Sequence, residues 1–178
     1  VETGDVVPPT KLPVEDVAQF EVSAYWGCAL LGDGETFQCW GQVDEHPPAT
    51  YDFEIVDFAL GKEHGCVVDG DGQVHCWGDN YHGQGGYGAP IRGMDDAVDV
   101  AAGWEHTCAR KSDGSVWCWG WNDEGQLGTI PTEFQESTDQ PREVPNVSGA
   151  TQIVCGEAHT CARTSEGSLR CWGGLLGW

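Results

Sequence analysis

The sequence predicts an all-β fold built from β-propeller-type repeats, with about four blades of antiparallel strands. A unit made of one cysteine, a tight-turn segment and Cys-Trp-Gly is written four times in 178 residues. A period of about 40 residues whose units carry strands and turns is typical of propellers and other repeat arrays. Turn residues and cysteine spacing independently indicate the same strand pairing. We therefore expect a partial propeller or a fragment of a longer ring.

The segment before the first repeat has a different composition. Residues 1–19 contain three prolines and several acidic residues but no apolar run. We expect an acidic, proline-containing linker or N-terminal extension over 1–19. The propeller-repeat domain is expected over 20–178, with the first repeat degenerate and the last incomplete. No signal peptide or transmembrane segment is recognisable, so secretion requires a leader that has already been removed.

The third repeat shows the strand pairing most clearly. Val98 to Arg110 and Ser115 to Trp121 are rich in β-branched, aromatic and small residues, which predicts a hairpin. If Cys108 lies opposite Cys118, counting inward leaves Ser112-Asp113-Gly114 as a three-residue loop. Such a loop commonly ends on a residue in the left-handed region, where glycine is best tolerated. The loop sequence therefore supports the pairing of the two cysteines.

The other three copies give the same register. The count ends the loops of the second and fourth copies on Gly72 and Gly167, while the first copy has a four-residue loop over 32–35. Each disulfide would close about 11 residues and stabilise the fold by roughly 2.5–3 kcal/mol. Eight of nine cysteines paired in this way indicate an oxidising compartment, extracellular or at the cell surface. The predicted disulfides are Cys28–Cys39, Cys66–Cys76, Cys108–Cys118 and Cys161–Cys171.

Two alternatives to disulfides are free buried cysteines and metal binding. His-x-Cys occurs at His64, His106 and His159, and alternate strand residues share a face, so each pair could reach one zinc ion. No CxxC spacing accompanies them, and the first copy has Trp26 at this position. We therefore expect structural histidines that hydrogen-bond backbone at a blade edge, with no metal and no cofactor. Cys155 is expected to be unpaired within the chain, as a buried small residue, a free thiol or the partner of a cysteine elsewhere.

The repeats resemble those of the regulator of chromosome condensation family. The third copy carries Gly103-x-x-His106-Thr-Cys108-Ala109, then Asp113-Gly114, Cys118-Trp119-Gly120 and Gly125-Gln126-Leu127-Gly128. The resemblance extends over residues from about 20 to 178, in the form of a secreted, disulfide-bearing variant of bacterial type. It implies four-stranded propeller blades, usually seven in a ring.

The chain is strongly acidic, which restricts its partners. With 29 acidic and 8 basic residues it has a formal charge of −21. Nucleic-acid affinity depends on lysine and arginine neutralising phosphates, so we expect no nucleic-acid binding. Attraction to anionic membrane surfaces and direct membrane insertion are not expected either. The acidity is explained by a solvated surface; calcium binding at Asp69-Gly70-Asp71-Gly72 is the alternative, although the remaining ligands of an EF-hand loop are missing.

Positions that vary among the repeats are free to serve recognition, and the third copy places tryptophan at three of them. In the other copies, the position of Trp104 holds Ala24, Lys62 and Glu157. The position of Trp117 holds Gln38, His75 and Arg170, and that of Trp121 holds Gln42, Asp79 and Gly174. Tryptophan is enriched among binding hot spots. Tyr81 and Tyr87 could extend the same surface. Alternatively, the tryptophans pack against the proline-containing insertion over 129–146, which we expect to be a surface loop.

No group of residues in the sequence forms a recognisable catalytic site. We therefore expect a secreted, non-enzymatic recognition module that binds a protein or a glycan through blade loops. The alternative is a structural repeat segment of a larger cell-surface or adhesin protein. A metal-dependent enzyme using the His-x-Cys pairs is a third hypothesis, which a metal-free preparation with no free thiols would remove.

Overall fold

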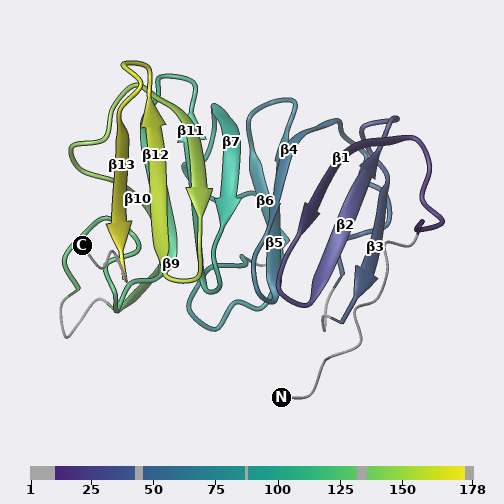
Figure 1. Cartoon of the computed structure of the whole chain (residues 1–178), viewed down its shortest axis with the longest axis horizontal. Helices are drawn as coiled ribbons and strands as arrows, with labels where there is room; N and C mark the ends of the chain where they lie inside the picture. The colour runs from purple at the N-terminus through teal and green to yellow at the C-terminus, as the bar shows by residue number, and fades with distance from the viewer. Residues whose placement is uncertain (1–10, 43–45, 87, 132–135, 175–178) are drawn as a thin grey trace, which may run out of the picture.

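The computed structural model describes residues 11–42, 46–86, 88–131 and 136–174. The strands found there form four antiparallel sheets that stand side by side as propeller blades (Figure 1). Within those ranges no helix is long and apolar enough to span a membrane. The predicted all-β class and repeat architecture are therefore confirmed.

Each repeat in the sequence forms one blade. Blade 1 contains β1 (Val17–Val22), β2 (Trp26–Leu31) and β3 (Phe37–Gly41), and blade 2 contains β4 (Ile55–Leu60), β5 (His64–Asp69) and β6 (Val74–Gly78). Blade 3 contains β7 (Ala97–Ala102), β8 (His106–Lys111), β9 (Val116–Trp121) and β10 (Ser137–Glu143), and blade 4 contains β11 (Ala150–Cys155), β12 (His159–Thr164) and β13 (Leu169–Gly173). The predicted boundary between an N-terminal extension over 1–19 and the repeat domain stays a prediction, because residues 1–10 lie outside the described part. The first strand, β1, begins at Val17, two residues before that boundary.

The second and third strands of every blade pair in the predicted register. Cys108 lies directly opposite Cys118, and the corresponding cysteines of the other blades face one another in the same way. All four predicted disulfides are present. Gly114 has φ of 81° at the end of its loop, and the Lys111 N–H donates to the Ser115 carbonyl at 3.0 Å. The turn therefore requires the glycine that the sequence places there.

The stretch from Val98 to Arg110 forms two strands rather than one. It folds back at Gly103-Trp104-Glu105, where the Gly103 N–H donates to the His106 carbonyl at 2.8 Å. The resulting strands β7 and β8 pair antiparallel. The expectation of one continuous strand was wrong because the turn is only three residues long and contains Trp104, a residue type that is common in strands. The turn places Trp104 at the end of the blade.

The insertion over 129–146 is more than a surface loop. Its residues Ser137–Glu143 form β10, which pairs with β9 and gives blade 3 its fourth strand. The register shifts between Thr138 and Arg142, and Pro141 lies in that irregular stretch. Proline lacks an N–H, so an edge strand with a bulge is where a sheet tolerates it. Sequence reasoning missed this strand because its residues are mostly polar.

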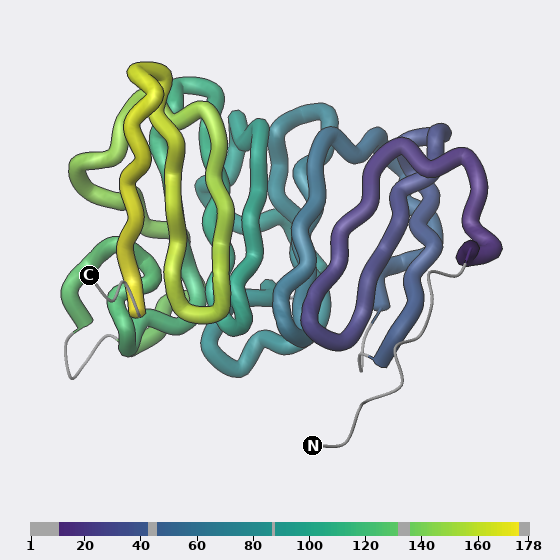
Figure 2. Tube along the Cα trace, in the orientation of Figure 1, coloured from purple at the N-terminus to yellow at the C-terminus, as the bar shows by residue number. Residues whose placement is uncertain are grey.

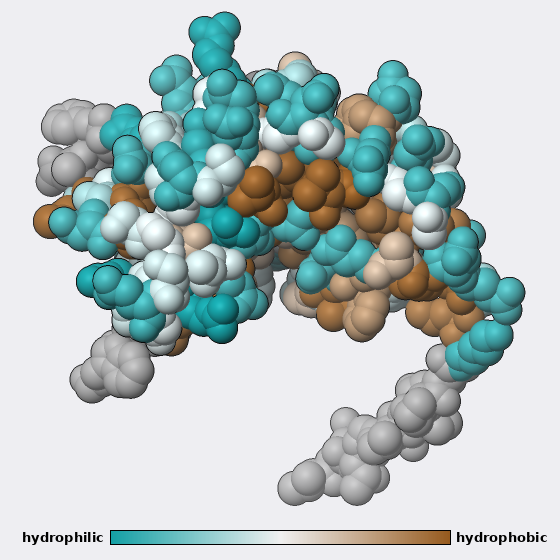
Figure 3. All heavy atoms as spheres, turned by 90° about the horizontal axis from the view of Figure 1, so that it is seen from above, coloured by the Kyte–Doolittle hydropathy of each residue, from teal (hydrophilic) through white to brown (hydrophobic). Residues whose placement is uncertain are grey.

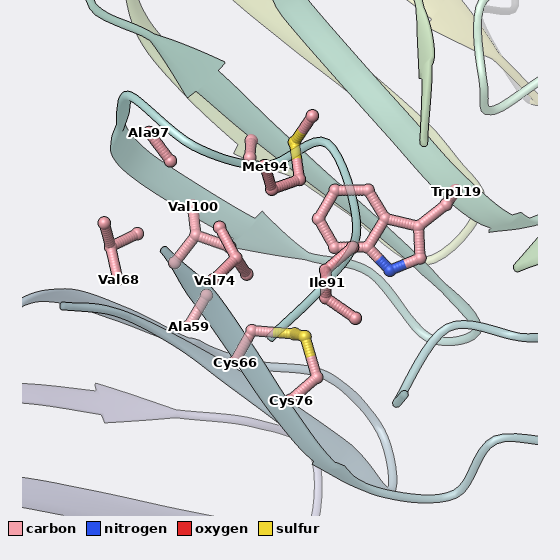
Figure 4. Close-up of a cluster of buried hydrophobic side chains, with 11 residues drawn as sticks. Ala59, Cys66, Val68, Val74, Cys76, Ile91, Met94, Ala97, Val100 and Trp119 are labelled. Carbon is pink, nitrogen blue, oxygen red and sulfur yellow. A yellow bond between two sulfur atoms is a disulfide. The ribbon is translucent and has the colours of Figure 1, made fainter. Parts of the chain in front are cut away.

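The core lies between the blades. Val68 and Val74 of blade 2 face Val100 and Trp119 of blade 3, with Met94 from the connecting segment filling the space beside them (Figure 4). Equivalent clusters join blades 1 and 2 and blades 3 and 4. Since apolar burial is the dominant favourable term in folding, these three contacts hold the array together.

The four blades form an open arc. Blade 1 and blade 4 stand at opposite ends of the row (Figure 2), and seen from above the molecule is indented on one side (Figure 3). At the two ends, Phe20 is 65% and Leu169 is 67% exposed. Their counterparts Phe58 and Val74 are buried between blades. The outer faces of the first and last blade are thus apolar and open.

Candidate functional site

Two of the predicted recognition residues meet at one cavity. Trp104 lies in the β7–β8 turn with 38% of its surface exposed, and Trp121 is the half-buried last residue of β9. Both line a cavity of about 440 Å³. Trp117, at the other end of β9, does not line it. The structure therefore brings Trp104 and Trp121 together and separates Trp117 from them.

The cavity lies where the turns between the first and second strands of blades 2, 3 and 4 meet. Lys62 comes from the β4–β5 turn, Trp104 from the β7–β8 turn and Glu157 from the β11–β12 turn. These turns lie along one edge of the row of blades, the lower edge in Figure 2. The remaining lining residues belong to the same turns, to the segment after β9 and to the end of blade 4: Glu105, Asp123, Glu124, Gln126, Ala158, His159 and Gly174.

Backbone hydrogen bonds fix the two tryptophans in place. The Trp104 N–H donates to the Glu157 carbonyl at 3.1 Å, which ties blade 3 to blade 4. The Trp121 N–H donates to the Glu105 carbonyl at 2.8 Å, which ties the end of β9 to the same turn. The wall of the cavity is therefore preorganised, and little ordering is required when a ligand binds.

The cavity is acidic and aromatic. Four acidic residues line it, Glu105, Asp123, Glu124 and Glu157, together with one lysine, Lys62. The Lys62 Nζ lies 5.5 Å from the centroid of the Trp104 ring, a cation–π contact. Such a cavity offers stacking surface together with acceptors for N–H donors.

A row of rings extends the site on one side. The His82 ring stacks on Trp121 with centroids 4.7 Å apart and planes inclined by 5°, and the edge of Tyr81 meets His82 at 4.8 Å. His82 Nε2 also lies 3.5 Å from Glu105 Oε2. Tyr81 is 86% exposed and lies next to the cavity rather than in it. Tyr87, the other tyrosine predicted for this surface, lies outside the described residues.

Trp117 has a different environment. Its Nε1–H donates to Ser115 Oγ at 3.0 Å, and the Lys111 ammonium lies 5.1 Å from its ring centroid. It packs against the core between blades 2 and 3 and pairs with Glu143 of β10. Its place beside the insertion agrees with the alternative stated for these tryptophans.

The acidic wall of the cavity was missed by sequence reasoning, although a signal for it existed. Lys62 and Glu157 occupy the repeat position of Trp104, and Gly174 that of Trp121. Positions that are equivalent in successive repeats come together at the end of the blades. An alignment of the repeats therefore points to part of this wall, namely Lys62, Glu157 and Gly174.

The histidines that recur in the repeats connect neighbouring blades. His64 Nε2 lies 2.9 Å from Thr107 Oγ1, and His106 Nε2 lies 2.9 Å from Thr160 Oγ1. The Thr107 hydroxyl donates to the Gln84 carbonyl, so His64 must donate to that hydroxyl through Nε2–H. The partner is a threonine hydroxyl of the next blade, and the expected backbone partner was wrong.

Both imidazoles are held neutral. Burial lowers the pKa of His64 to about 4 and that of His106 to about 3. Their Nδ1 atoms are buried without a hydrogen-bond partner, so a second ring proton would have no acceptor. These links therefore depend on the neutral form of the ring.

The group of His106, Cys108 and Cys155 has the proximity of a metal site, with ligand atoms within 4.8 Å of one another. However, Cys108 is bonded to Cys118 and offers no thiolate. Cys155 is the free cysteine, as predicted; its Sγ lies 3.7 Å from Thr160 Oγ1, and burial raises the pKa of its thiol to about 12. This arrangement suits a packed thiol better than a metal ligand.

Comparison with protein families identifies the repeats. A family model described as the regulator of chromosome condensation (RCC1) repeat matches residues 113–163, and a second model of that description matches 55–84 and 97–126. Together these segments cover more than half of the chain. A search of curated proteins finds no match.

Solved structures with a similar fold come from several settings. Yeast RCC1 (Prp20), in its complex with Kap60, is 24% identical with a TM-score of 0.76, over 90% of this chain and 42% of that one. Human WBSCR16 is 22% identical with a TM-score of 0.73, over 93% and 50%. The CRINKLY ectodomain of the Arabidopsis thaliana receptor kinase ACR4 is 23% identical with a TM-score of 0.63, over 91% and 51%. The chain thus spans about half the length of these proteins.

Proposed function

This chain belongs to the regulator of chromosome condensation repeat family, and from that premise we propose that it is a secreted, non-enzymatic module that recognises a partner protein. The observation that carries the proposal is the cavity lined by Trp104 and Trp121. At neither position does the repeat scaffold require an aromatic residue. Two partly exposed tryptophans on a fixed backbone are the kind of anchor that dominates the energy of protein interfaces.

A protein partner is supported by what similar proteins bind. Yeast RCC1 (Prp20) is described in complex with Kap60 and by its binding to Gsp1p and histones. Function in such folds resides in surface loops rather than in the scaffold. In this chain the loops at the cavity contribute stacking surface and hydrogen-bond acceptors, which are groups for binding.

An extracellular location is supported by the covalent structure. Four disulfides in 178 residues are typical of proteins that fold in an oxidising compartment. Two of the similar structures are ectodomains, from the receptor kinases ACR4 of Arabidopsis thaliana and CR4 of Physcomitrella patens. Domains of similar fold therefore do occur outside the cell.

The test is capture of the partner from native extracellular fluid on immobilised protein. Trp104→Ala should weaken binding by about 2 kcal/mol or more and leave the unfolding temperature nearly unchanged, because the ring is partly exposed. Tyr25→Ala, at an exposed tyrosine outside the cavity, is the control and should retain the partner. Equal retention by both variants would contradict the proposal. A captured ligand that survives protease digestion would identify a glycan instead.

A structural role within a larger array is the second candidate. It is favoured by Phe20 and Leu169, which are exposed at positions that other blades bury. In that case the outer faces would associate with further sheets. Sedimentation of the chain alone tests it, since Phe20→Ser and Leu169→Ser should then abolish a concentration-dependent association.

A further inference from the structure

We propose that the cavity between Trp104 and Trp121 receives a cationic side chain, lysine or arginine, of the partner protein. This inference rests on the proposed function and names the chemistry that the site selects. It is carried by three independent features of the cavity: its charge, its aromatic rings and an internal cation already placed on one of them.

The charge of the cavity favours a cation. Four carboxylates line it against the single ammonium of Lys62. Asp123, Glu124 and Glu157 are exposed, so a ligand can reach them. The charge of the whole chain, −21, attracts a basic partner over a longer range and raises the rate of encounter.

The rings offer the second element of cation recognition. Tryptophan has the strongest cation–π attraction among the aromatic side chains. The Lys62 Nζ, 5.5 Å from the Trp104 centroid, marks the place that a cationic head group takes in this cavity. Trp121 is held on one side by the stacked His82 ring, which fixes its orientation toward the lining.

Two of the acidic residues lie on the turns that hold the rings. The Glu157 backbone carbonyl accepts the Trp104 N–H, so this acidic residue and this ring lie on adjacent turns joined by a hydrogen bond. Glu105 follows Trp104 in the same turn; its Oε2 is buried and makes no hydrogen bond, and His82 Nε2 lies 3.5 Å from it. The cavity of about 440 Å³ lies within the range of about 300–1,000 Å³ usual for ligand sites.

Lys62 competes with a cationic ligand for the face of the Trp104 ring, and this gives a direct test. Removing its charge frees the Trp104 ring and removes a like charge from the site. Lys62→Gln should therefore strengthen the binding of a basic peptide at least three-fold. A merely structural contribution of Lys62 would change affinity in the opposite direction.

The experiment measures binding of tetra-arginine, tetra-lysine and tetra-glutamate peptides to the whole chain by calorimetry at 0.15 M salt. The basic peptides should bind and the acidic peptide should not. Trp104→Ala should weaken basic-peptide binding at least ten-fold. Glu157→Gln should weaken it several-fold, whereas Glu166→Gln, the same change at an exposed hairpin tip of the same blade, should not.

Three results would overturn the inference: no preference for the basic peptides, equal weakening by Glu157→Gln and Glu166→Gln, or weaker binding by Lys62→Gln. Equal weakening would mean that only net charge matters. If the natural partner is lost on Trp104→Ala but the peptides fail, the proposed function stands and the cation chemistry is wrong. If neither partner nor peptide depends on Trp104, both fail.

Discussion

Acidification should destabilise this fold through the two buried histidines that link its blades. His64 and His106 are neutral, fully buried and hydrogen-bonded to threonines of the following blade. Their folded pKa values, about 4 and about 3, lie below the ordinary value of 6.5. The stability that they contribute is complete above pH 6.5 and is lost as the pH falls toward the folded pKa values.

The magnitude follows from proton binding. Between pH 6.5 and about 4 the unfolded chain holds up to one more proton at each of these rings than the folded chain. Each ring therefore lowers the free energy of unfolding by at most about 1.4 kcal/mol per pH unit in this range. Asp99 acts in the opposite direction, because burial raises its pKa to about 6 and the folded state takes up a proton there first.

The contribution of one histidine can be separated from those of the other groups by comparing how steeply the free energy of unfolding varies with pH in a variant and in the wild type. His106→Gln cannot titrate, so its free energy of unfolding should vary less with pH than that of the wild type, by at most about 1.4 kcal/mol per unit between pH 6 and 4. Urea unfolding at pH 7, 6, 5 and 4 gives both slopes, and a uniform loss of stability cancels. Gln42→Ala, at an exposed side chain that does not titrate, is the control and should keep the wild-type slope. An unchanged slope for His106→Gln would refute the reasoning.

Three further outcomes follow from the scaffold and its charge. Gly103→Ala should lower the free energy of unfolding by more than about 2 kcal/mol, because a Cβ there would lie 2.1 Å from His106 Cε1. Gly70→Ala, where a Cβ would meet nothing within 4 Å, should be nearly neutral, and thermal unfolding compares the two variants. Replacing Cys28 and Cys39 together by alanine should cost roughly 2.5–3 kcal/mol in urea unfolding, and no loss would contradict the chain-entropy argument. The chain should pass through a DNA or heparin column at about 0.15 M salt, and retention would show that the charge argument is wrong.

The strand register was predictable because it depends on counting along the chain. Cysteine spacing and the glycine that ends each loop are local features, and in each of the three hairpins with a three-residue loop they specify one pairing. The fourth strand of blade 3 was not predictable in this way. Its polar, proline-containing residues gain strand structure only from pairing with β9, which is a tertiary effect.

The site was predictable in part. Trp104 and Trp121 were found because they depart from the repeat consensus, but Trp117 departs in the same way and lies elsewhere. Trp117 and Trp121 are four residues apart on β9, which separates them by about 13 Å along the strand. Trp121 is the one that meets Trp104, because the β8–β9 register places the end of β9 beside the β7–β8 turn, where the Trp121 N–H donates to the Glu105 carbonyl. The sequence did not predict the turn at Gly103-Trp104-Glu105, so it did not predict which tryptophan lies next to Trp104.

Gln126 takes part in two features: it links blade 3 to blade 4, and it lines the cavity. Its carbonyl accepts the Thr160 hydroxyl at 3.2 Å and the Trp172 Nε1–H at 2.9 Å, and the residue lines the cavity. The corresponding carbonyl between blades 2 and 3 belongs to Gln84, which accepts the Thr107 hydroxyl and is not part of the lining.

Two equivalent substitutions should therefore have different consequences. Thr107→Val and Thr160→Val each leave a histidine Nε2–H without its acceptor, so both should lower stability, by about 1–3 kcal/mol in urea unfolding. Only Thr160→Val also removes a hydrogen bond to Gln126, which lines the cavity. Only this variant should therefore weaken binding of the partner captured through Trp104. If both variants weaken binding equally, the loss reflects general destabilisation, and the cavity does not depend on the link between blades 3 and 4.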